Sequence, residues 1–509
     1  MTNLVELLKK LLRDVVLFVR YASGLKLRTY QEAVARAVVH SVLHQQGLSF
    51  VIIFPRQSGK NELQAQLQSY LLALLSNQEV EMVQVSPTWR PQTENAMHRL
   101  EGVLSKNLIL KDRWEKHHGH IYQVGRARLT FLSGSPTSNI VGATANLLLS
   151  VDEAQDIQIN KFDKDIAPMA ASTNATRVFW GTAWTATTLL AREEKAALAR
   201  QEKDGLQRVW RINVNDVAAE VPAYGQFVAA QVNKLGRSHP MVKTQYYSEE
   251  IDAEGGFFPP DRLSLLHGTH PPQWKSEPGC VYAMTLDVAG EDEREGQDLD
   301  GLKNPARDAT AMTICEIITT PDPTLRCALP HYRIVFRQQW LGIKHVQLYH
   351  VLLSLAETWQ IRFLVSDATG VGAGLTAFLS KALGSRVIPF VFNSRTKSDL
   401  GWAFLALVDS GRLKDYAPQE DHPDNLSRLH ALFFQQLQHT QFTIFPGPEK
   451  RIRWGVPDGT RDPATGELVH DDLLICAALI SQLDDQNWSV SGPGVVIKAH
   501  DPLEDMKGF

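Results

Sequence analysis

The sequence predicts a mixed α/β protein with two units, each built on its own sheet. From about residue 50 to 185, short apolar runs rich in β-branched residues alternate with helical patterns, which is typical of a parallel, doubly wound sheet. A turn-rich break at 255–260 is followed by a second set of apolar strands that begins at 281–288. The chain has 509 residues, of which 44% are hydrophobic and 21% charged, so it can fill two or three cores.

The division of the chain follows these changes of pattern. The first residues carry leucines at helical spacing, but Lys9, Lys10 and Arg13 interrupt them too often for a signal peptide or a membrane span. We therefore expect an amphipathic helix that packs on the first unit or on a partner. The predicted parts are an N-terminal helix at 1–24, a first unit at 25–250 with a helical lid at about 186–250, a linker at 251–275, a second unit at 276–486 and a tail at 487–509.

The segment 49–62, SFVIIFPRQSGKNE, has the pattern of a buried strand, a tight loop and a helix start. Phosphate binds well at such a point, because free backbone N–H groups and the positive helix end face the loop. Taken alone, however, such a segment is more often an ordinary turn. Phe54 replaces the first glycine of the usual phosphate loop, and Asn61 replaces its final hydroxyl residue. The residues expected at a nucleotide are Arg56, Gln57, Ser58, Gly59, Lys60 and Asn61, with Lys60 on the β and γ phosphates.

A second apolar strand, 147–151, ends in the paired carboxylates Asp152 and Glu153. Asp152 at the strand end suits a Mg²⁺ ion bound to phosphates, and Glu153 suits polarisation of an attacking water. The alternative is a solvated strand end. A third apolar run, 176–180, leads into Gly181-Thr182-Ala183, where Thr182 could sense the γ-phosphate. Together with the loop, these segments predict nucleotide hydrolysis.

The second half carries further acids at the ends of apolar segments. Asp287 ends one predicted strand, Asp367 ends another, and Asp471 and Asp472 begin a hydrophobic helix. Each acid could be a turn former or a helix cap. Converging, they could instead bind two Mg²⁺ or Mn²⁺ ions that activate water and stabilise the leaving oxygen of a phosphodiester.

The net charge of −4 means that contacts with nucleic acid must come from local basic surface. The four cysteines show no C-x-x-C spacing, which predicts buried thiols and fits a reducing cytoplasm. Candidates for contact with a DNA backbone are Arg395, Lys397, Lys450, Arg451 and Arg453, with Trp454, although each charge alone is more typical of a solvated face.

The order of these segments resembles the large terminase subunit of tailed bacteriophages and prophages. The resemblance covers residues of about 25 to 485 and rests on the ordered segments LRTYQ, PRQSGKN, LLLSVDEAQ, WGTA, LDVAG, VSDATGVGAG and HDDLLICAAL. It implies an N-terminal P-loop ATPase joined to a C-terminal RNase H-like nuclease, with ATP and Mg²⁺ as cofactors and Mn²⁺ as a further metal for the nuclease.

The resemblance also implies roles for single residues. Gln31 looks like the adenine-side residue, Arg56 like the arginine of the phosphate loop, Lys60 like the phosphate-binding lysine, Asp152 like the Mg²⁺ ligand, Glu153 like the catalytic carboxylate and Gly181-Thr182-Ala183 like the coupling motif. Asp287, Asp367 and Asp472 match the nuclease metal ligands, with Asp471 sharing the third position. Family members can carry an arginine where this chain has Val141, so the arginine that reaches a neighbouring subunit is unassigned.

The function implied is a motor that couples ATP hydrolysis to translocation of duplex DNA into a capsid and cuts concatemeric DNA. The implied partners are double-stranded DNA, a portal protein, a small terminase subunit and further copies of the chain in a pentameric ring, with no membrane. The implied location is the host bacterial cytoplasm and, transiently, the procapsid portal. Two alternatives are a helicase-nuclease of DNA repair or phage defence, and a portal-docking adaptor with decayed catalytic sites.

Overall fold

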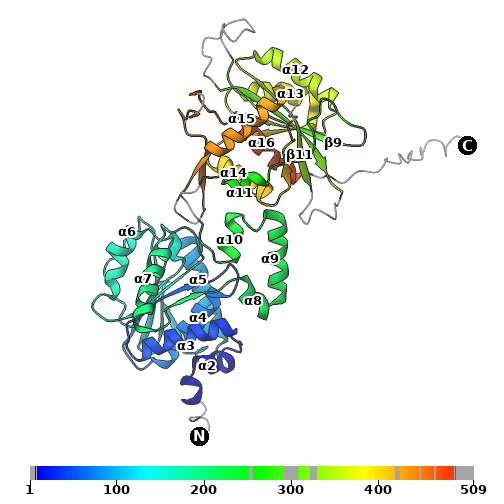
Figure 1. The fold of residues 1–509 in the computed structure, drawn as a ribbon. Coiled ribbons are helices and arrows are strands. Elements are labelled where there is room, and N and C mark those ends of the chain that lie inside the picture. Colours follow the sequence, from blue (N-terminus) through cyan, green and yellow to red (C-terminus); the bar gives the residue numbers. More distant parts are fainter. Residues whose placement is uncertain are drawn as a thin grey trace, which may run out of the picture.

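Two α/β units lie one above the other, with a group of three helices between them (Figure 1). The structure is a computed structural model, and it describes residues 6, 9–251, 256–291, 308–320, 330–418, 425–445, 447, 449–463, 466–486 and 488. Each unit has its own sheet and its own buried core, so the predicted α/β fold class is confirmed. Most of the predicted tail at 487–509 lies outside the described residues.

The first unit is built on an eight-stranded sheet with the order β3-β4-β5-β2-β6-β7-β1-β8. The strands from β5 to β8 in this order are parallel, and β3 and β4 add an antiparallel edge. One strand, β7, separates the strand before the phosphate loop from the strand before the acid pair. The bounds are β1 Ser49–Ile53, β2 Glu81–Ser86, β3 Trp114–His117, β4 Ile121–Val124, β5 Ala127–Ser133, β6 Leu148–Val151, β7 Thr176–Gly181 and β8 Val209–Arg211.

Helices cover both faces of this sheet because its central strands are apolar on both sides. In β1, Phe50 and Ile52 join one core and Val51 and Ile53 the other, as the two-residue period of a strand requires. The helices of the first core are α2 Val15–Ala22, α3 Thr29–Leu43, α4 Lys60–Leu74 and α5 Glu94–Lys106. The second core is covered by α7 Leu189–Asp204 and by the short turns η2 Ala154–Asp156, α6 Ile159–Lys161, η3 Phe162–Ile166 and η4 Ala167–Ala170; η1 Trp89–Thr93 precedes α5.

Two predictions for the first unit need correction. The N-terminal segment is not one helix, because Asp14 caps a separate helix, α2, whose buried side chains pack on the first unit; Leu4, Leu7 and Leu8 lie outside the described residues. The range 186–250 is not a single lid, since α7 packs on the sheet and β8 extends it. Only the three helices between the units fit that description: α8 Val214–Glu220, α9 Pro222–Leu235 and α10 Pro240–Tyr246. Within the described part of the chain, no helix has both the length and the apolar character of a membrane span.

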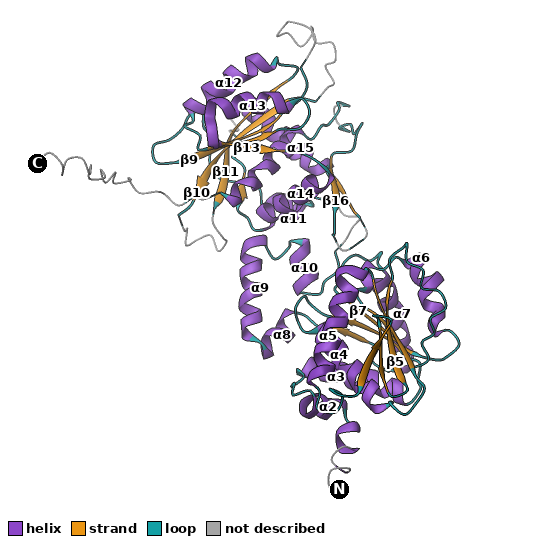
Figure 2. Ribbon diagram, turned by 180° about the vertical axis from the view of Figure 1, so that it is seen from behind, coloured by secondary structure: helices purple, strands orange, loops and turns teal. Residues whose placement is uncertain are grey.

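The second unit contains a six-stranded sheet with the order β13-β12-β9-β10-β11-β14 (Figure 2). β9, β10 and β11 form an antiparallel meander, while β12 and β13 run parallel to β9. The strands are β9 Val281–Asp287, β10 Thr310–Ile318, β11 His331–Trp340, β12 Phe363–Asp367, β13 Val387–Phe390 and β14 Leu413–Lys414, and a separate hairpin joins β15 Gln441–Ile444 to β16 Ile452–Gly455. The helices are α11 Pro260–Ser264, α12 His345–Thr358, α13 Gly372–Leu383, α14 Ser394–Asp409, α15 Asn425–His439 and α16 Asp472–Ala478, with the turns η6 Gly384–Arg386 and η7 Leu479–Asp485.

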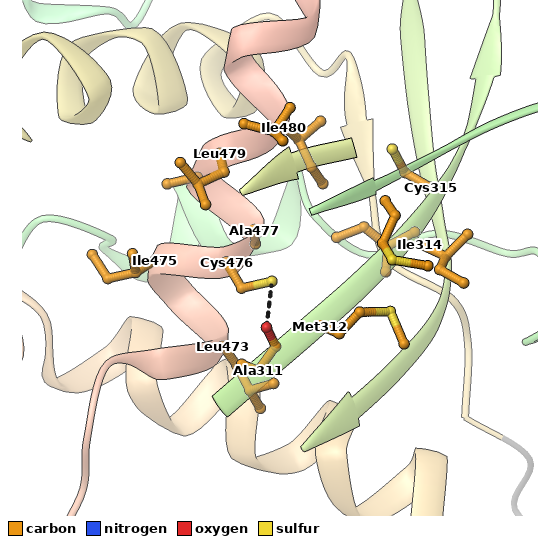
Figure 3. Packing of buried hydrophobic residues seen from close by; sticks show 14 of the residues in the cluster. Ala311, Met312, Ile314, Cys315, Leu473, Ile475, Cys476, Ala477, Leu479 and Ile480 are labelled. Atoms are coloured by element: carbon orange, nitrogen blue, oxygen red, sulfur yellow. Dashed lines mark hydrogen bonds between the residues drawn. The ribbon is translucent and has the colours of Figure 1, made fainter. Parts of the chain in front are cut away.

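Helix α16 is buried against the centre of the second sheet (Figure 3). Its side chains pack with Met312 and Ile314 of β10, and the Cys476 thiol donates a hydrogen bond to the Ala311 carbonyl at 3.4 Å. Every residue of this helix is buried, including its first residue, Asp472. The packing therefore fixes the helix start beside the ends of the strands.

The predicted linker at 251–275 is largely part of the second unit. Phe257 and Phe258 are buried in the second core, as are Leu263 and Leu266 around α11. Phe257 stacks on Trp454 with ring centroids 5.5 Å apart. The expected role of Trp454 at a DNA backbone is therefore wrong, since its side chain is only 3% exposed and its indole N–H donates to the Lys397 carbonyl.

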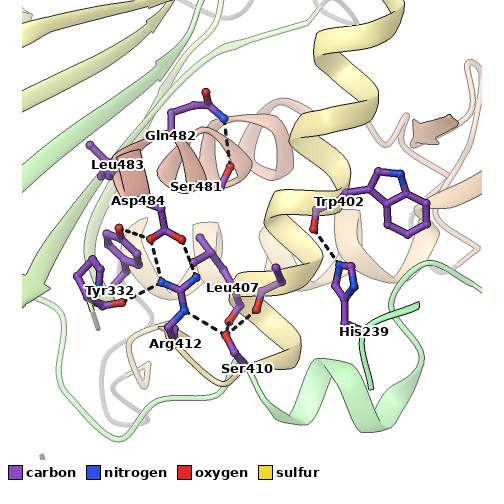
Figure 4. A network of polar contacts seen from close by, with 12 residues as sticks. His239, Tyr332, Trp402, Leu407, Ser410, Arg412, Ser481, Gln482, Leu483 and Asp484 are labelled. Carbon is purple, nitrogen blue, oxygen red and sulfur yellow. Dashed lines mark hydrogen bonds and ion pairs between the residues drawn. The ribbon is translucent and has the colours of Figure 1, made fainter. Parts of the chain in front are cut away.

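The two units meet where α9 and the turn that follows it contact α14. His239 Nε2 donates to the Trp402 carbonyl at 3.2 Å (Figure 4). The Nδ1 atom of His239 accepts from the Met241 N–H at 3.2 Å. The Trp402 ring also lies 6.4 Å from that of Trp184, at the end of the first sheet. His239 is thus held as a neutral, buried imidazole at the contact between the units, and burial lowers its pKa to about 4.

We expect this histidine to make the contact sensitive to acid. A proton on Nδ1 would face the Met241 N–H, so the unfolded chain binds this proton more readily and stability is lost as the pH falls from 6.5 towards 4. The loss approaches roughly 3 kcal/mol. Urea unfolding at several pH values should show a shallower loss for His239→Gln than for the wild type.

The exposed His98 on α5 provides the matched control. His98→Gln should follow the wild-type profile. Identical profiles for His239→Gln and the wild type would contradict the assignment.

Candidate functional site

The loop between β1 and α4 has the backbone of a tight anion-binding turn. Gln57 and Gly59 both have positive φ, of 60° and 94°. Gly59 is the N-cap of α4, and a Cβ at this position would lie 2.7 Å from the Gln31 amide nitrogen. Glycine is therefore required both by the left-handed conformation and by the close approach of Gln31.

Residues at the start of α3 hold this loop by donating three hydrogen bonds to the loop's carbonyl groups. The Arg28 guanidinium and the Tyr30 hydroxyl donate to the Ser58 carbonyl at 2.7 and 2.8 Å, and the Gln31 amide donates to the Gly59 carbonyl at 3.1 Å. Gln31 also accepts from the Arg28 N–H, so both ends of its side chain are engaged. This position favours a role in holding the loop, in place of the adenine contact that the resemblance implied.

Phe54, which departs from the usual loop pattern, is fully buried. Its ring meets Tyr30 edge to face with centroids 5.5 Å apart. The missing glycine is therefore replaced by packing beneath the loop. On the other side, the Tyr224 hydroxyl donates to the Arg56 carbonyl and the Arg56 N–H donates to the Gln245 carbonyl, which joins the loop to the helices between the units.

Lys60 lies between the two carboxylates that follow β6. Its ammonium group is bonded to Glu153 and lies 3.4 Å from Asp152. Asp152 also accepts from the Gln64 amide at 2.9 Å. Burial lowers the pKa of Lys60, but the two adjacent carboxylates outweigh burial and raise it, so the lysine stays charged.

The two acids of the pair differ in their surroundings. Burial raises the pKa of Asp152, whereas the charge of Lys60 overcomes burial and lowers the pKa of Glu153. Glu153 also has a left-handed backbone, with φ 47°, which is uncommon outside glycine and is found often at functional sites. The structure thus presents Glu153 as an ionised carboxylate directly after the strand.

Gln155 connects the acid strand to the strand beside it. Its amide donates to Glu153 at 2.6 Å and to Asp156 at 3.2 Å, and its carbonyl oxygen accepts from the Thr182 N–H at 3.2 Å. A Cβ on Gly181 would lie 2.2 Å from this oxygen, so only glycine leaves room for the contact. The sequence contained Gln155 in its second motif, but nothing in the residue pattern indicated this bridge.

These groups surround a pocket of about 600 Å³ at the carboxyl ends of the strands, where ligands bind in such sheets. The predicted residues on its walls are Arg56, Gln57, Gly59, Lys60, Asn61, Glu153 and Thr182, whereas Ser58 and Asp152 do not line it. The Ser58 hydroxyl instead donates to the Pro55 carbonyl at 2.6 Å, and Asp152 lies behind Lys60. The sequence missed Gln92, Arg99, Gln155, Asp156, Gln245 and Lys450 as wall residues. Burial raises the pKa of Asp156 to about 6.

The acids of the second unit lie at the carboxyl ends of two central strands of its sheet. β9 and β12 are adjacent and parallel, with Leu286 paired to Ser366, so the following residues Asp287 and Asp367 end neighbouring strands together. Asp472 begins the helix packed against the same strands. The three acids predicted from separate motifs are therefore brought together by the topology of the sheet.

The acids influence one another's pKa values. Burial and then the charges of Asp472, Asp367 and Asp471 raise the pKa of Asp287 well above its usual range. Burial raises the pKa of Asp472 to about 7 and also raises that of Asp367. Such a group of buried carboxyl oxygens suits Mg²⁺ or Mn²⁺, because a divalent cation would offset both burial and repulsion. Among the described residues, no three His, Cys, Asp or Glu side chains enclose one metal position, so the arrangement is open.

The adjacent acids Asp471 and Asp472 have different partners. Asp472 accepts from the Ala309 N–H at 3.0 Å, which turns its carboxyl group toward the strands. Asp471 lies 3.8 Å from the Lys397 ammonium group, near the β15–β16 hairpin. The geometry thus favours Asp472 as the principal third acid, with Asp471 farther out.

No protein-family model and no curated protein matches the sequence. Among solved structures, the large terminase of the thermophilic bacteriophage D6E is similar over 90% of this chain and 99% of its own, with 10% identity and a TM-score of 0.45. The HK97 bacteriophage large terminase is similar over 92% and 99%, with 11% identity and a TM-score of 0.36. The large terminase nuclease of the thermophilic phage G20c, solved with bound magnesium, is similar over 45% and 98%, with 15% identity and a TM-score of 0.31.

We expect divalent cations to stabilise the second unit through its acids. Mg²⁺ at about one hundred times its Kd should add roughly 2–3 kcal/mol to the free energy of unfolding. Asp287→Asn should lose most of this gain, yet be more stable than the wild type in EDTA, because it removes a carboxyl group whose ionisation is opposed by burial and by the neighbouring acids. Thermal unfolding with Mg²⁺ or EDTA measures both effects.

The exposed Asp458 provides the control, since Asp458→Asn should leave the Mg²⁺ gain intact. An equal Mg²⁺ gain in Asp287→Asn and the wild type would remove Asp287 from the site.

Proposed function

We propose that this protein hydrolyses ATP in its first unit to move duplex DNA and cuts DNA with a metal-dependent nuclease in its second unit. The observation that carries the proposal is Lys60, whose charge is buried between two carboxylates at the mouth of a phosphate-loop pocket. A second, separate acid group at the edge of the other sheet supports the nuclease.

In the first unit, the residues prepare both the phosphate and the water. A bound γ-phosphate would draw the Lys60 ammonium group away from Glu153 and leave that carboxylate free to orient a water molecule. The water oxygen attacks the γ-phosphorus, the bond to the ADP oxygen breaks, and Glu153 accepts the water proton. Gln155 keeps Glu153 in place and links it to Thr182, next to the expected γ-phosphate. Mg²⁺, held on the Asp152 side, would supply charge neutralisation on the phosphates.

In the second unit, Asp287, Asp367 and Asp472 would hold the divalent cations. Two such ions would supply an activated water and stabilise the leaving oxygen of a phosphodiester. The carboxyl groups would hold the ions beside the carboxyl ends of β9 and β12, and Asp367 is oriented by the Thr369 N–H at 2.8 Å. Because no base-reading module is recognised in the sequence, cutting should tolerate most sequences.

The biological setting that fits both activities is DNA packaging. The proposed partners are a portal protein, a small terminase subunit and further copies of this chain in a pentameric ring, in the host bacterial cytoplasm and on the procapsid. A helicase-nuclease would use the same two sites, but it would separate the strands of a forked DNA, whereas a packaging motor moves the duplex intact. The adaptor alternative is less favoured, because Phe54 packs against Tyr30 beneath the loop and Lys60 is still paired with its acids.

We expect the two activities to be separable by single substitutions. Lys60→Ala should lower ATP turnover by orders of magnitude, because the interaction with phosphate is electrostatic, and should leave plasmid nicking intact. Asp367→Ala should abolish nicking with Mg²⁺ or Mn²⁺ and retain ATP turnover. Each variant thus serves as the folding control of the other, and undiminished ATP turnover in Lys60→Ala would refute the first assignment.

The position of Gln31 predicts a loss of affinity without a loss of base selectivity. Gln31→Ala removes one hydrogen bond to the loop, so it should weaken ATP-γ-S and GTP-γ-S by the same factor, about fivefold. Competition binding with both nucleotides tests this prediction. A loss of affinity for ATP-γ-S alone would support the assignment of Gln31 to the adenine base.

A further inference from the structure

One wall of the pocket in the first unit comes from the second unit. Lys450 lies in the connection between β15 and β16, yet it lines the pocket together with Lys60, Glu153 and Thr182. Figure 2 shows β16 on the side of the second unit that faces the first. The pocket is therefore shared between the two units. Lys450 follows every other wall residue by more than a hundred positions in the sequence.

The ammonium group of Lys450 is buried without a hydrogen-bonding partner among the described residues. It lies 4.0 Å from the centroid of the Trp184 ring. Burial lowers the pKa of Lys450 to about 8 despite the attraction of Asp156 and Glu153. A cation that is desolvated and not hydrogen-bonded is costly, so its position calls for an anionic partner.

The backbone at Lys450 is also constrained. Its φ is 50°, a left-handed conformation that residues other than glycine adopt rarely. The Lys450 carbonyl accepts a hydrogen bond from the Trp402 indole at 3.1 Å. Trp402 in turn meets Trp184 and accepts from His239 at the contact between the units. The lysine is thus held in the pocket by the same residues that join the two units.

The charges around Lys450 indicate which end of a nucleotide it would meet. Asp156 and Glu153 attract its charge, and Arg56 and Lys60 repel it. Glu153 is the group expected beside the attacking water, so Lys450 lies at the catalytic end of the pocket. The carboxylates at this end are bonded to Lys60 and to Gln155, and neither accepts a hydrogen bond from the Lys450 ammonium group, so an added anion at this end would supply the partner that it lacks.

We propose that Lys450 contacts the terminal phosphate of a bound nucleoside triphosphate, so that the second unit distinguishes triphosphate from diphosphate. The proposal rests on the function proposed above and adds a contact from the other half of the chain. When the γ-phosphate leaves, Lys450 loses its anion and the contact through Trp402 and Trp184 loses one of its supports. Nucleotide state is thereby transmitted to the contact between the units.

The test compares the affinities of the full-length protein for ATP-γ-S and for ADP, measured by competition against a fluorescent nucleotide. Lys450→Met should lower the affinity for ATP-γ-S about tenfold and change the affinity for ADP by less than about twofold, as expected for one charge-assisted contact to the terminal phosphate. Lys450→Arg should retain most of the preference. Lys203→Met, on the exposed end of α7, is the matched control and should bind as the wild type does.

Each outcome decides a separate point. An unchanged ratio of the two affinities in Lys450→Met, or an equal weakening of both, would overturn the proposal and leave Lys450 as an interface cation. If Lys450→Met does not fold, as judged by circular dichroism, Lys450→Gln decides with the same ratio. Lys60→Ala tests the nucleotide site apart from the Lys450 contact, because wild-type affinity in that variant would refute the nucleotide site itself.

Discussion

The structure depends on one buried ionic group, in which Lys60 is held between Asp152 and Glu153. A lysine and two carboxylates removed from water are stable only as a set, so the loop, the acid strand and the strand between them must keep their register. Two residues with a left-handed backbone, Gln57 and Glu153, belong to the loop and the acid pair of this set. The parallel sheet, covered on both faces, supplies the rigid frame that this arrangement requires.

The second acid group follows a different logic. Its carboxyl groups have no lysine at their centre, and their raised pKa values reflect burial and mutual repulsion. Such a group is a source of instability that the surrounding core must offset. The burial of every residue in α16, which begins with Asp472, shows how that is achieved. One unit thus neutralises its acids internally, whereas the other leaves them in need of an external cation.

Sequence patterns were sufficient for the strand-loop-helix at Lys60 and for the acids, because a carboxylate at the end of an apolar strand is a local signal. They failed where the decisive contact is remote. The resemblance placed Gln31 at the base, and no pattern indicated that its side chain donates to the Gly59 carbonyl. Trp454 was placed on the surface because its neighbours are basic, yet Phe257, from a segment read as a linker, buries it. Lys450 has no motif of its own, since its role in the pocket arises only when two distant segments fold together.

The position of the β15–β16 connection limits how this architecture can diversify. A first unit combined with a foreign second unit would keep its loop and its acid pair but lose one wall of the pocket. The indole of Trp402, which fixes that wall, would be lost with it. Recombination between relatives should therefore favour exchange of the whole pair over exchange of either half. The two halves would then be inherited as a matched set, although each has its own sheet and core.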